Sequence, residues 1–235
     1  MKKLATLAAG LLAATAMMAQ PAAGTFSITP KVGIGASTLS NDAYGRMYTI
    51  KTGKHSTQFV KAETEPALEV EAGVELGYQL TRRFGLSAGV FYAQQGAKRE
   101  KSGGWNNSAF QVEDKSHLDL DYINIPVLAN FYVWRGLTLK VGLQAGILLA
   151  AEDHIDVNGG ASADGFSDHR TLDVKSQCNP VDIAIPVGIA YEFDSGIMLE
   201  GRANLGVNDL YKHSHGCNVG LQLTIGYKFK MGKKR

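Results

Sequence analysis

The chain has 235 residues, of which 24 are Lys or Arg and 22 are Asp or Glu, so its formal net charge is +2. This balance gives no reason to expect the strongly basic surface that nucleic-acid binding requires. Beyond the first 19 residues, no run approaches the length of about 18 apolar residues that marks a transmembrane helix. The composition therefore argues against a nucleic-acid-binding protein and against a helical membrane protein.

The N-terminus has the layout of a secretory signal peptide. Lys2 and Lys3 form a short basic region, and the apolar segment after them is too short to span a membrane. Cleavage is expected after Ala19, with two nearby alanines as alternative sites. A buried N-terminal helix is the alternative interpretation of the segment. We expect a cleaved signal peptide over residues 1–19 and a single domain over residues 20–235.

Eight later stretches alternate apolar and polar residues with a period of two. The last is the clearest, because Val219, Leu221 and Leu223 share one face of a strand while Gln222 and Thr224 share the other. A strand that crosses a bilayer needs about 9–11 residues, apolar toward lipid and polar toward the lumen. The eight stretches run over residues 26–39, 68–80, 84–95, 118–133, 137–150, 181–193, 197–207 and 219–229.

The connections between these stretches alternate between short and long. The short ones lie at 81–83, 134–136 and 194–196, and the long ones at 41–66, 98–117, 151–180 and 208–218. Bacterial outer-membrane barrels have short periplasmic turns and longer extracellular loops, so both termini are expected in the periplasm. Aromatic residues gather where this assignment places the periplasmic membrane interface: Phe26, Tyr78, Phe84, Phe131, Trp134, Tyr191, Phe193, Tyr227 and Phe229.

Together these patterns predict an all-β fold, an eight-stranded antiparallel up-and-down transmembrane β-barrel in the outer membrane. The alternative is a secreted soluble barrel or sandwich, which would bury the apolar faces. The polar faces hold glycine and a mixture of acids and bases, which suits a narrow lumen. Outer-membrane lipid is then the expected surrounding, and the C-terminal strand is expected to engage the barrel-assembly machinery.

Ten charged residues fall on the polar faces of the predicted strands. The interior of an eight-stranded barrel is about wide enough for its own side chains, so we expect a structural charge network and no diffusion pore. A proton or ion path is the alternative. The residues are Lys31, Glu69, Glu71, Glu75, Lys140, Asp182, Glu192, Glu200, Arg202 and Lys228.

Two prolines and two cysteines stand out from the alternation. Pro126 and Pro186 lie inside predicted strands with their rings toward the lumen, so each site is expected to hold a β-bulge or a missing hydrogen bond. Cys178 and Cys217 shortly precede the sixth and eighth strands, at the extracellular rim in an oxidising compartment. We expect a Cys178–Cys217 disulfide, and two unpaired thiols are the alternative.

All six histidines fall in the predicted long loops. Imidazole and carboxylate groups are ligands for divalent metals, and the third loop is also rich in Asp. The candidate metal ligands are His154, His169, His213 and His215, although loops also collect histidine that lipid-facing strands exclude. No motif requires a cofactor. His213 and Ser214 are adjacent and point to opposite sides of an extended chain, so no enzyme is predicted.

The stretch Tyr122-Ile123-Asn124-Ile125-Pro126-Val127-Leu128 resembles a segment typical of PorT-family outer-membrane barrels of Bacteroidota. Residues 196–210 are similar to that family's penultimate strand through Glu200, Arg202, Gly206 and Asp209. The resemblance implies an eight-stranded outer-membrane barrel. It implies no catalytic residues, because the family shares none.

The function expected from the sequence is a structural or surface-interaction role carried by the extracellular loops, with an envelope or extracellular protein as partner. Four aromatic residues in the first two loops are of the kind that partner sites use, although loop aromatics also pack locally: Tyr44, Tyr48, Trp105 and Phe110. The alternative function is capture of a divalent metal or a metal chelate by the third and fourth loops.

Overall fold

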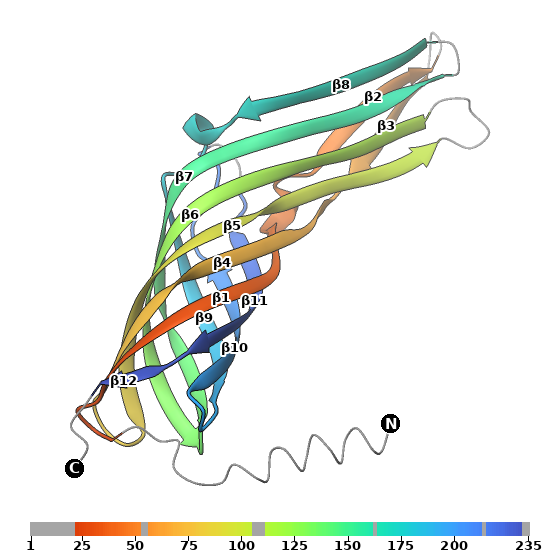
Figure 1. Cartoon of the computed structure of the whole chain (residues 1–235). Coiled ribbons are helices and arrows are strands. Elements are labelled where there is room, and N and C mark those ends of the chain that lie inside the picture. Colours follow the sequence, from red (N-terminus) through yellow and green to blue (C-terminus); the bar gives the residue numbers. More distant parts are fainter. Residues whose placement is uncertain (1–21, 53–55, 105–110, 162–163, 213–214, 232–235) are drawn as a thin grey trace, which may run out of the picture.

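The computed structural model describes residues 22–52, 56–104, 111–161, 164–212 and 215–231 (Figure 1). The predicted signal peptide, residues 1–19, lies outside these residues. Eight strands build the main sheet: β1 (Phe26–Leu39), β4 (Thr64–Gln79), β5 (Phe84–Gly104), β6 (Gln111–Trp134), β7 (Leu137–Ala161), β9 (Val181–Glu192), β10 (Ile197–Gly206) and β11 (Asn218–Tyr227). The described part also contains β2 (Arg46–Thr52), β3 (Ser56–Ala62), β8 (Asp164–Asp173), β12 (Phe229–Met231) and the short 3-10 helices η1 (Ser40–Asp42) and η2 (Lys175–Gln177).

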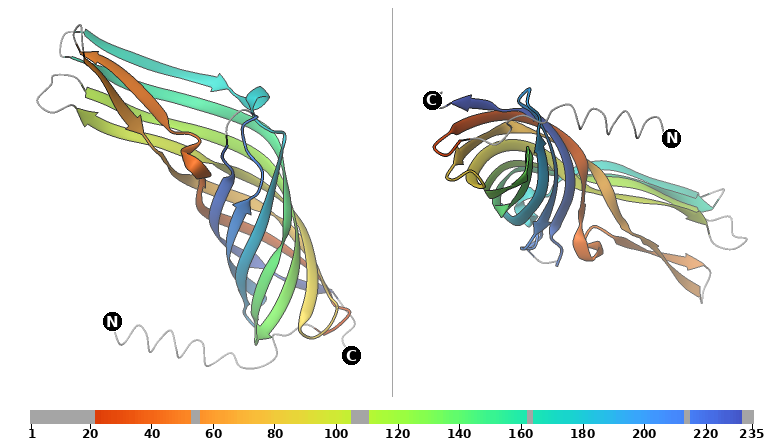
Figure 2. Two further views of the ribbon diagram at one scale, coloured as in Figure 1. Left: turned by 180° about the vertical axis from the view of Figure 1, so that it is seen from behind. Right: turned by 90° about the horizontal axis from the view of Figure 1, so that it is seen from below.

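The eight strands of the main sheet form a closed antiparallel ring. Each strand pairs with the next one in chain order, and β1 pairs with both β4 and β11, which closes the sheet. β12 continues β11 past Lys228 and pairs with the start of β1, so that Phe26 lies opposite Met231. The eight-stranded antiparallel barrel predicted from the sequence is confirmed, and Figure 2 shows it from behind and from below.

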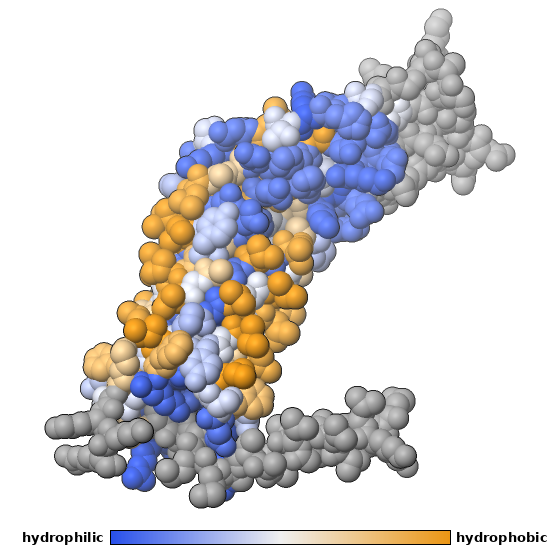
Figure 3. Space-filling model, viewed as in Figure 1, coloured by the Kyte–Doolittle hydropathy of each residue, from blue (hydrophilic) through white to orange (hydrophobic). Residues whose placement is uncertain are grey.

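The barrel carries its apolar residues on the outside. In β11, Leu221 and Leu223 are 66% and 62% exposed, whereas Gln222 and Thr224 are 3% and 2% exposed. The same alternation recurs around the ring and produces the hydrophobic band in Figure 3. A soluble barrel or sandwich would bury these residues, so the outward apolar face is incompatible with that alternative. Among the described residues there is no helix with the length and hydropathy of a membrane span.

The two ends of the barrel differ. The short connections lie at one end, together with the start of β1 and with β12, and we call this the turn end. At the opposite end, β5, β6 and β7 continue past the hydrophobic band and form, with β8, a sheet that leans away from the barrel (Figure 1). We call this part the extended sheet; it comprises residues 97–104, 111–121, 150–161 and 164–173.

The extended sheet corrects the predicted loops. The sequence predicts loops over 98–117 and 151–180, but β5 runs to Gly104, β6 begins at Gln111 and β7 runs to Ala161. The predicted first loop likewise contains the hairpin of β2 and β3. These predictions are wrong because a strand is recognised in the sequence by its alternating apolar residues, and that alternation ends at the membrane boundary. The ladder hydrogen bonds continue beyond that boundary into strands that face water on one side.

A β-bulge marks the passage from the barrel into the extended sheet. Tyr122 pairs with Leu148 while Asp121 pairs with Ala150, which leaves Leu149 as an extra residue in β7. Before the bulge the even-numbered residues of β7 face the lumen, and after it the odd-numbered residues, such as Ile155, are the buried ones. A bulge bends its strand and increases the local twist, which fits the change in direction of the sheet at this point.

Pro126 and Pro186 are both buried, which places them on the lumenal side as predicted. The β5–β6 ladder has no pair at Pro126, and the β7–β9 ladder has none at Pro186. Each ladder resumes in the same register on the far side of its gap. Each proline therefore removes ladder pairing without adding a residue, so of the two expected outcomes the missing hydrogen bond is the one observed.

Candidate functional site

Four charged side chains cross the middle of the lumen. Lys31 Nζ lies 2.7 Å from Glu75 Oε2 and 2.7 Å from Glu200 Oε2. Lys140 Nζ lies 2.8 Å from Glu75 Oε1 and 2.8 Å from Glu200 Oε2. All four residues are buried. The two ammonium groups neutralise the two carboxylates, which is the arrangement that buried charges require. We call these residues the lumenal quartet.

A second polar group lies between the quartet and the extended sheet. Arg202 Nη2 donates hydrogen bonds to Glu71 Oε1 at 2.6 Å and to Gln222 Oε1 at 3.0 Å. Glu69 accepts hydrogen bonds from the side chains of Gln222 and Gln95. Because these side chains come from β4, β5, β10 and β11, they continue the polar filling of the lumen beyond the quartet.

The lumen is also narrow near the turn end. Lys228 Nζ lies 2.9 Å from Glu192 Oε2 and donates a hydrogen bond to the Tyr132 hydroxyl at 3.1 Å. The cavity that Lys228 and Glu75 help to line has a volume of about 20 Å³, room for roughly one water molecule.

Asp182 is buried, and its Oδ1 has no hydrogen-bond partner among the described residues. Nine of the ten residues expected in the lumen are fully buried there, and Lys228 is half-buried.

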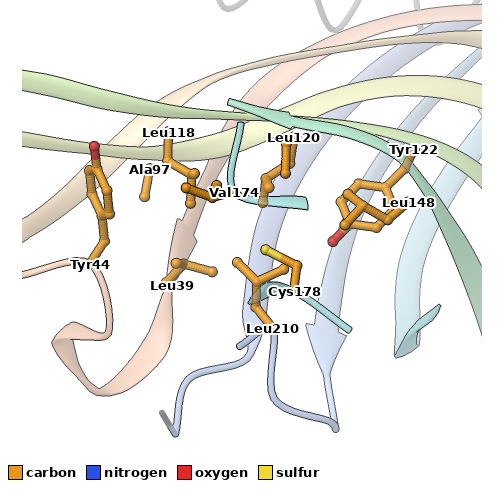
Figure 4. Packing of buried hydrophobic residues seen from close by; sticks show 11 residues of the cluster. Leu39, Tyr44, Ala97, Leu118, Leu120, Tyr122, Leu148, Val174, Cys178 and Leu210 are labelled. Atoms are coloured by element: carbon orange, nitrogen blue, oxygen red, sulfur yellow. The ribbon is translucent and has the colours of Figure 1, made fainter. Parts of the chain in front are cut away.

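An apolar cluster covers the lumen at the end opposite the turns (Figure 4). It joins the inward faces of β6 and β7 to the connections that follow β1, β8 and β10. Its buried members are Leu39, Tyr44, Ala97, Leu118, Leu120, Tyr122, Leu148, Ala151, Val174, Cys178 and Leu210. We call this group the cap cluster. This cluster is not among the predictions from the sequence. Leu118 and Leu120 are a visible signal of it, because they place leucine on the lumenal face of β6.

Tyr44 is a member of the cap cluster and not the exposed partner-site residue that the sequence suggested. It is 5% exposed, and its hydroxyl donates a hydrogen bond to Asp153 Oδ1. Burial and this hydrogen bond raise the pKa of Tyr44 above its ordinary value. Trp105 and Phe110 lie outside the described residues, and the side chain of Tyr48 does as well.

The two cysteines differ in burial. Cys178 is 1% exposed within the cap cluster, and burial raises the pKa of its thiol to about 11. Cys217 is half-buried and lies directly before the start of β11. Both cysteines are free in the structure, which therefore does not contain the expected disulfide.

The outward face of the extended sheet gathers imidazole and carboxylate groups. His117 on β6 pairs in register with His154 on β7, and their rings stack with centroids 4.5 Å apart and planes 15° from parallel. Asp119 Oδ2 lies 3.4 Å from His154 Nε2 and 3.8 Å from His117 Nε2. Glu152 Oε2 lies 3.6 Å from His154 Nε2, and Thr171 Oγ1 on β8 lies 3.0 Å from His154 Nδ1. Two strands, β6 and β7, thus bring ligand-type atoms to one place, and β8 adds a hydroxyl beside them.

Of the four histidines predicted as metal ligands, the three that the structure describes do not come together. His154 lies in this cluster, whereas His169 and His215 each lie against a single Asp elsewhere. His213 lies outside the described residues. His117 is not one of the four predicted ligands, but it belongs to the cluster through the pairing of β6 with β7.

The family model described as outer membrane protein beta-barrel domain matches residues 18–212 of the chain. The chain belongs to this family. This membership agrees with the closed ring and the outward apolar band, and it places the protein in the outer membrane. No curated protein matches the sequence.

Two solved structures resemble this member of the family. Ail, the attachment invasion locus protein of Yersinia pestis, is 12% identical with a TM-score of 0.37, over 88% of this chain and 99% of Ail. Neisserial surface protein A (NspA) is 12% identical with a TM-score of 0.42, over 90% of this chain and 99% of NspA. At this level of similarity, neither structure indicates a ligand or a partner for this chain.

Proposed function

We propose that the barrel is a closed outer-membrane anchor and that the extended sheet is a surface for interaction with an extracellular or envelope partner. The proposal rests on the continuity of β5, β6 and β7, which leave the hydrophobic band without a break and form a sheet with β8 beyond it. In this orientation the turn end and both termini are periplasmic, in line with the short turns of bacterial barrels.

The orientation is tested with one introduced cysteine in a Cys217→Ser background, where the remaining Cys178 is buried. Ser167 on β8 and Asp194 in a turn are both exposed. A membrane-impermeant maleimide should label the Ser167→Cys variant in intact cells and the Asp194→Cys variant only after the outer membrane is permeabilised. The reverse pattern would place the extended sheet in the periplasm and overturn the proposal.

The proposal does not include a diffusion pore. The lumenal quartet and the cap cluster both obstruct the path through the barrel, and about one water fits the cavity near the turn end. Protein reconstituted in planar lipid bilayers should show no stepwise conductance, with a general porin as the positive control. Steady single-channel currents would contradict a closed barrel, provided that the same protein shows the heat-dependent gel mobility of a folded barrel.

The interaction role is tested by separating the barrel from the extended sheet. A variant with short turns in place of residues 98–117 and 151–180 should keep the heat-dependent gel shift, because the ring strands and the lumenal quartet remain. Native electrophoresis of extracted outer membranes should then show a partner complex with the full chain only. Identical complexes with the shortened chain would locate the interaction on the barrel.

Three finer assignments belong to the same proposal. Residues 1–19 are removed as a signal peptide, and β11 with β12 engages the barrel-assembly machinery, since these strands close the ring against β1. The Tyr122-to-Leu128 segment supports a relation to PorT-type barrels. No catalytic step is included.

A further inference from the structure

The stacked histidines on the extended sheet and Asp119 bring three candidate metal-ligand atoms close together. Asp119 Oδ2 lies 3.4 and 3.8 Å from the two Nε2 atoms, and the candidate ligand atoms of His117, Asp119 and His154 all lie within 4.8 Å of one another. Tetrahedral zinc with bonds of about 2.0–2.1 Å holds neighbouring ligand atoms roughly 3.3 Å apart. The distances from Asp119 Oδ2 are close to this value. Because a metal ion lies in the plane of each imidazole that binds it, the two nearly parallel rings must rotate about their side-chain torsions before both Nε2 atoms face one ion.

The surroundings support the ligating tautomer of one of these histidines. Thr171 Oγ1 lies 3.0 Å from His154 Nδ1, so in the tautomer whose Nδ1–H donates to Thr171, Nε2 is the free lone pair. Hydrogen bonding of the second ring nitrogen is the usual support of a metal-bound histidine. The ligands also stand on paired strands, since His117 lies opposite His154 and Asp119 lies opposite Glu152.

The other described histidines in contact with acids lack this arrangement. His169 Nδ1 lies 2.9 Å from Asp156 Oδ1, and His215 Nδ1 lies 3.0 Å from Asp209 Oδ2. Each of these pairs offers one imidazole and one carboxylate. The cluster on β6 and β7 instead offers two imidazoles that share one carboxylate oxygen, with Glu152 Oε2 at 3.6 Å from His154 Nε2 as a possible fourth ligand.

We propose that His117, Asp119 and His154 bind one Zn²⁺ ion on the outward face of the extended sheet, with Glu152 or water in the fourth position. With water in the fourth position, the site keeps one exchangeable ligand, so the ion can also bind a donor group of a partner. The inference rests on the proposed function only for the location of the site outside the cell. Zinc binding is measurable on purified protein, so its failure is distinguishable from failure of the orientation test.

The test is calorimetric titration of ZnCl₂ into the untagged protein, folded in detergent and checked by its heat-dependent gel shift. One zinc per chain is expected, and His117→Ala or His154→Ala should abolish binding. Asp119→Asn keeps the size of the side chain and should also weaken binding strongly, which covers the case in which a histidine variant fails to fold. Thr171→Val removes only the supporting hydroxyl and should weaken binding by about tenfold.

Two variants serve as matched controls. His169→Ala and His215→Ala each remove an exposed histidine that contacts one Asp, and neither should change zinc affinity. Absence of zinc binding by folded protein at millimolar zinc would overturn the proposal. An equal loss of affinity in the control variants would also overturn it, because zinc would then be bound by scattered surface histidines.

Discussion

Lys140 on β7 and Glu75 on β4 form an ion pair across the lumen, with Nζ 2.8 Å from Oε1. In the ring, β5 and β6 separate these strands on one side, and β9, β10, β11 and β1 separate them on the other. Together with Lys31 and Glu200, the contacts connect four of the eight ring strands. The lumenal quartet therefore braces the barrel wall and obstructs the lumen at the same time.

Replacing Lys140 tests the bracing. Lys140→Met keeps much of the side-chain volume but leaves the carboxylates of Glu75 and Glu200 with Lys31 as the one remaining cation of the quartet. Removal of one partner from a buried ion pair costs about 3–5 kcal/mol. Denaturant unfolding in detergent, followed by the heat-dependent gel shift, should show a loss of this size.

The matched control for this variant is Lys115→Met. Lys115 Nζ lies 2.6 Å from Glu113 Oε1 on the exposed face of the extended sheet, where ion pairs contribute little to stability. Its unfolding midpoint should equal that of the unmodified chain. A similar destabilisation in both variants would mean that the lumenal quartet has no special bracing role.

The position of the membrane boundary is tested by introducing one arginine at two sites. Leu223 is 62% exposed near the middle of β11, and Leu172 is 39% exposed on β8 in the extended sheet. Leu223→Arg should cost about 2–4 kcal/mol, because a charge near the bilayer midplane loses its hydration. Leu172→Arg should leave the free energy of unfolding in lipid vesicles unchanged, since this site faces water. Equal losses would show that the hydrophobic band extends over both sites.

The barrel was predictable from the sequence because lipid and lumen impose opposite demands on alternate residues. Leu221 and Gln222 illustrate this contrast within one strand. The extended sheet was not predictable in the same way, since its outward face meets water and carries residues such as His154 and Thr171 that are also common in loops. Without an apolar side to reveal the period of two, strand and loop look alike in sequence.

The lumenal charges were predictable for the same reason, but their partners were not. Alternation places Lys31 and Glu200 inside the barrel, whereas their contact depends on how far each strand is shifted along its neighbours. The same holds for His117 and His154, which stand in different predicted loops. Their pairing depends on the register of β6 and β7, and the extra residue Leu149 offsets that register by one.

The cysteines should differ in reactivity. Cys178 is buried in the cap cluster with a thiol pKa of about 11, so a maleimide at neutral pH should not modify it in the folded protein. Half-buried Cys217 should be modified under the same conditions. Mass spectrometry of the labelled protein measures both sites. If neither thiol reacts until the protein is unfolded and reduced, the disulfide expected from the sequence is present in the membrane protein.

Deleting Leu149 tests whether the bulge in β7 is a separable element. Without this residue, Leu148 can still pair with Tyr122 and Ala150 with Asp121, so every residue of β7 keeps its present face. The deletion should therefore leave a heat-modifiable barrel. It should remove only the local bending and the hydrogen bond that Lys175 Nζ donates to the Leu149 carbonyl, which lowers the free energy of unfolding by roughly 1 kcal/mol.

Deletion of Leu139, in the same strand but inside the barrel, is the matched control. No bulge absorbs this deletion, so one part of β7 must shift by one residue. Either the later part shifts and side chains such as Lys140 and Gln144 turn from the lumen to the lipid, or the residues before the deletion exchange their faces. This variant should fail to fold into a heat-modifiable form. If the Leu149 deletion fails as well, the bulge is required for closure of the barrel, and the turn toward the extended sheet is part of the barrel fold.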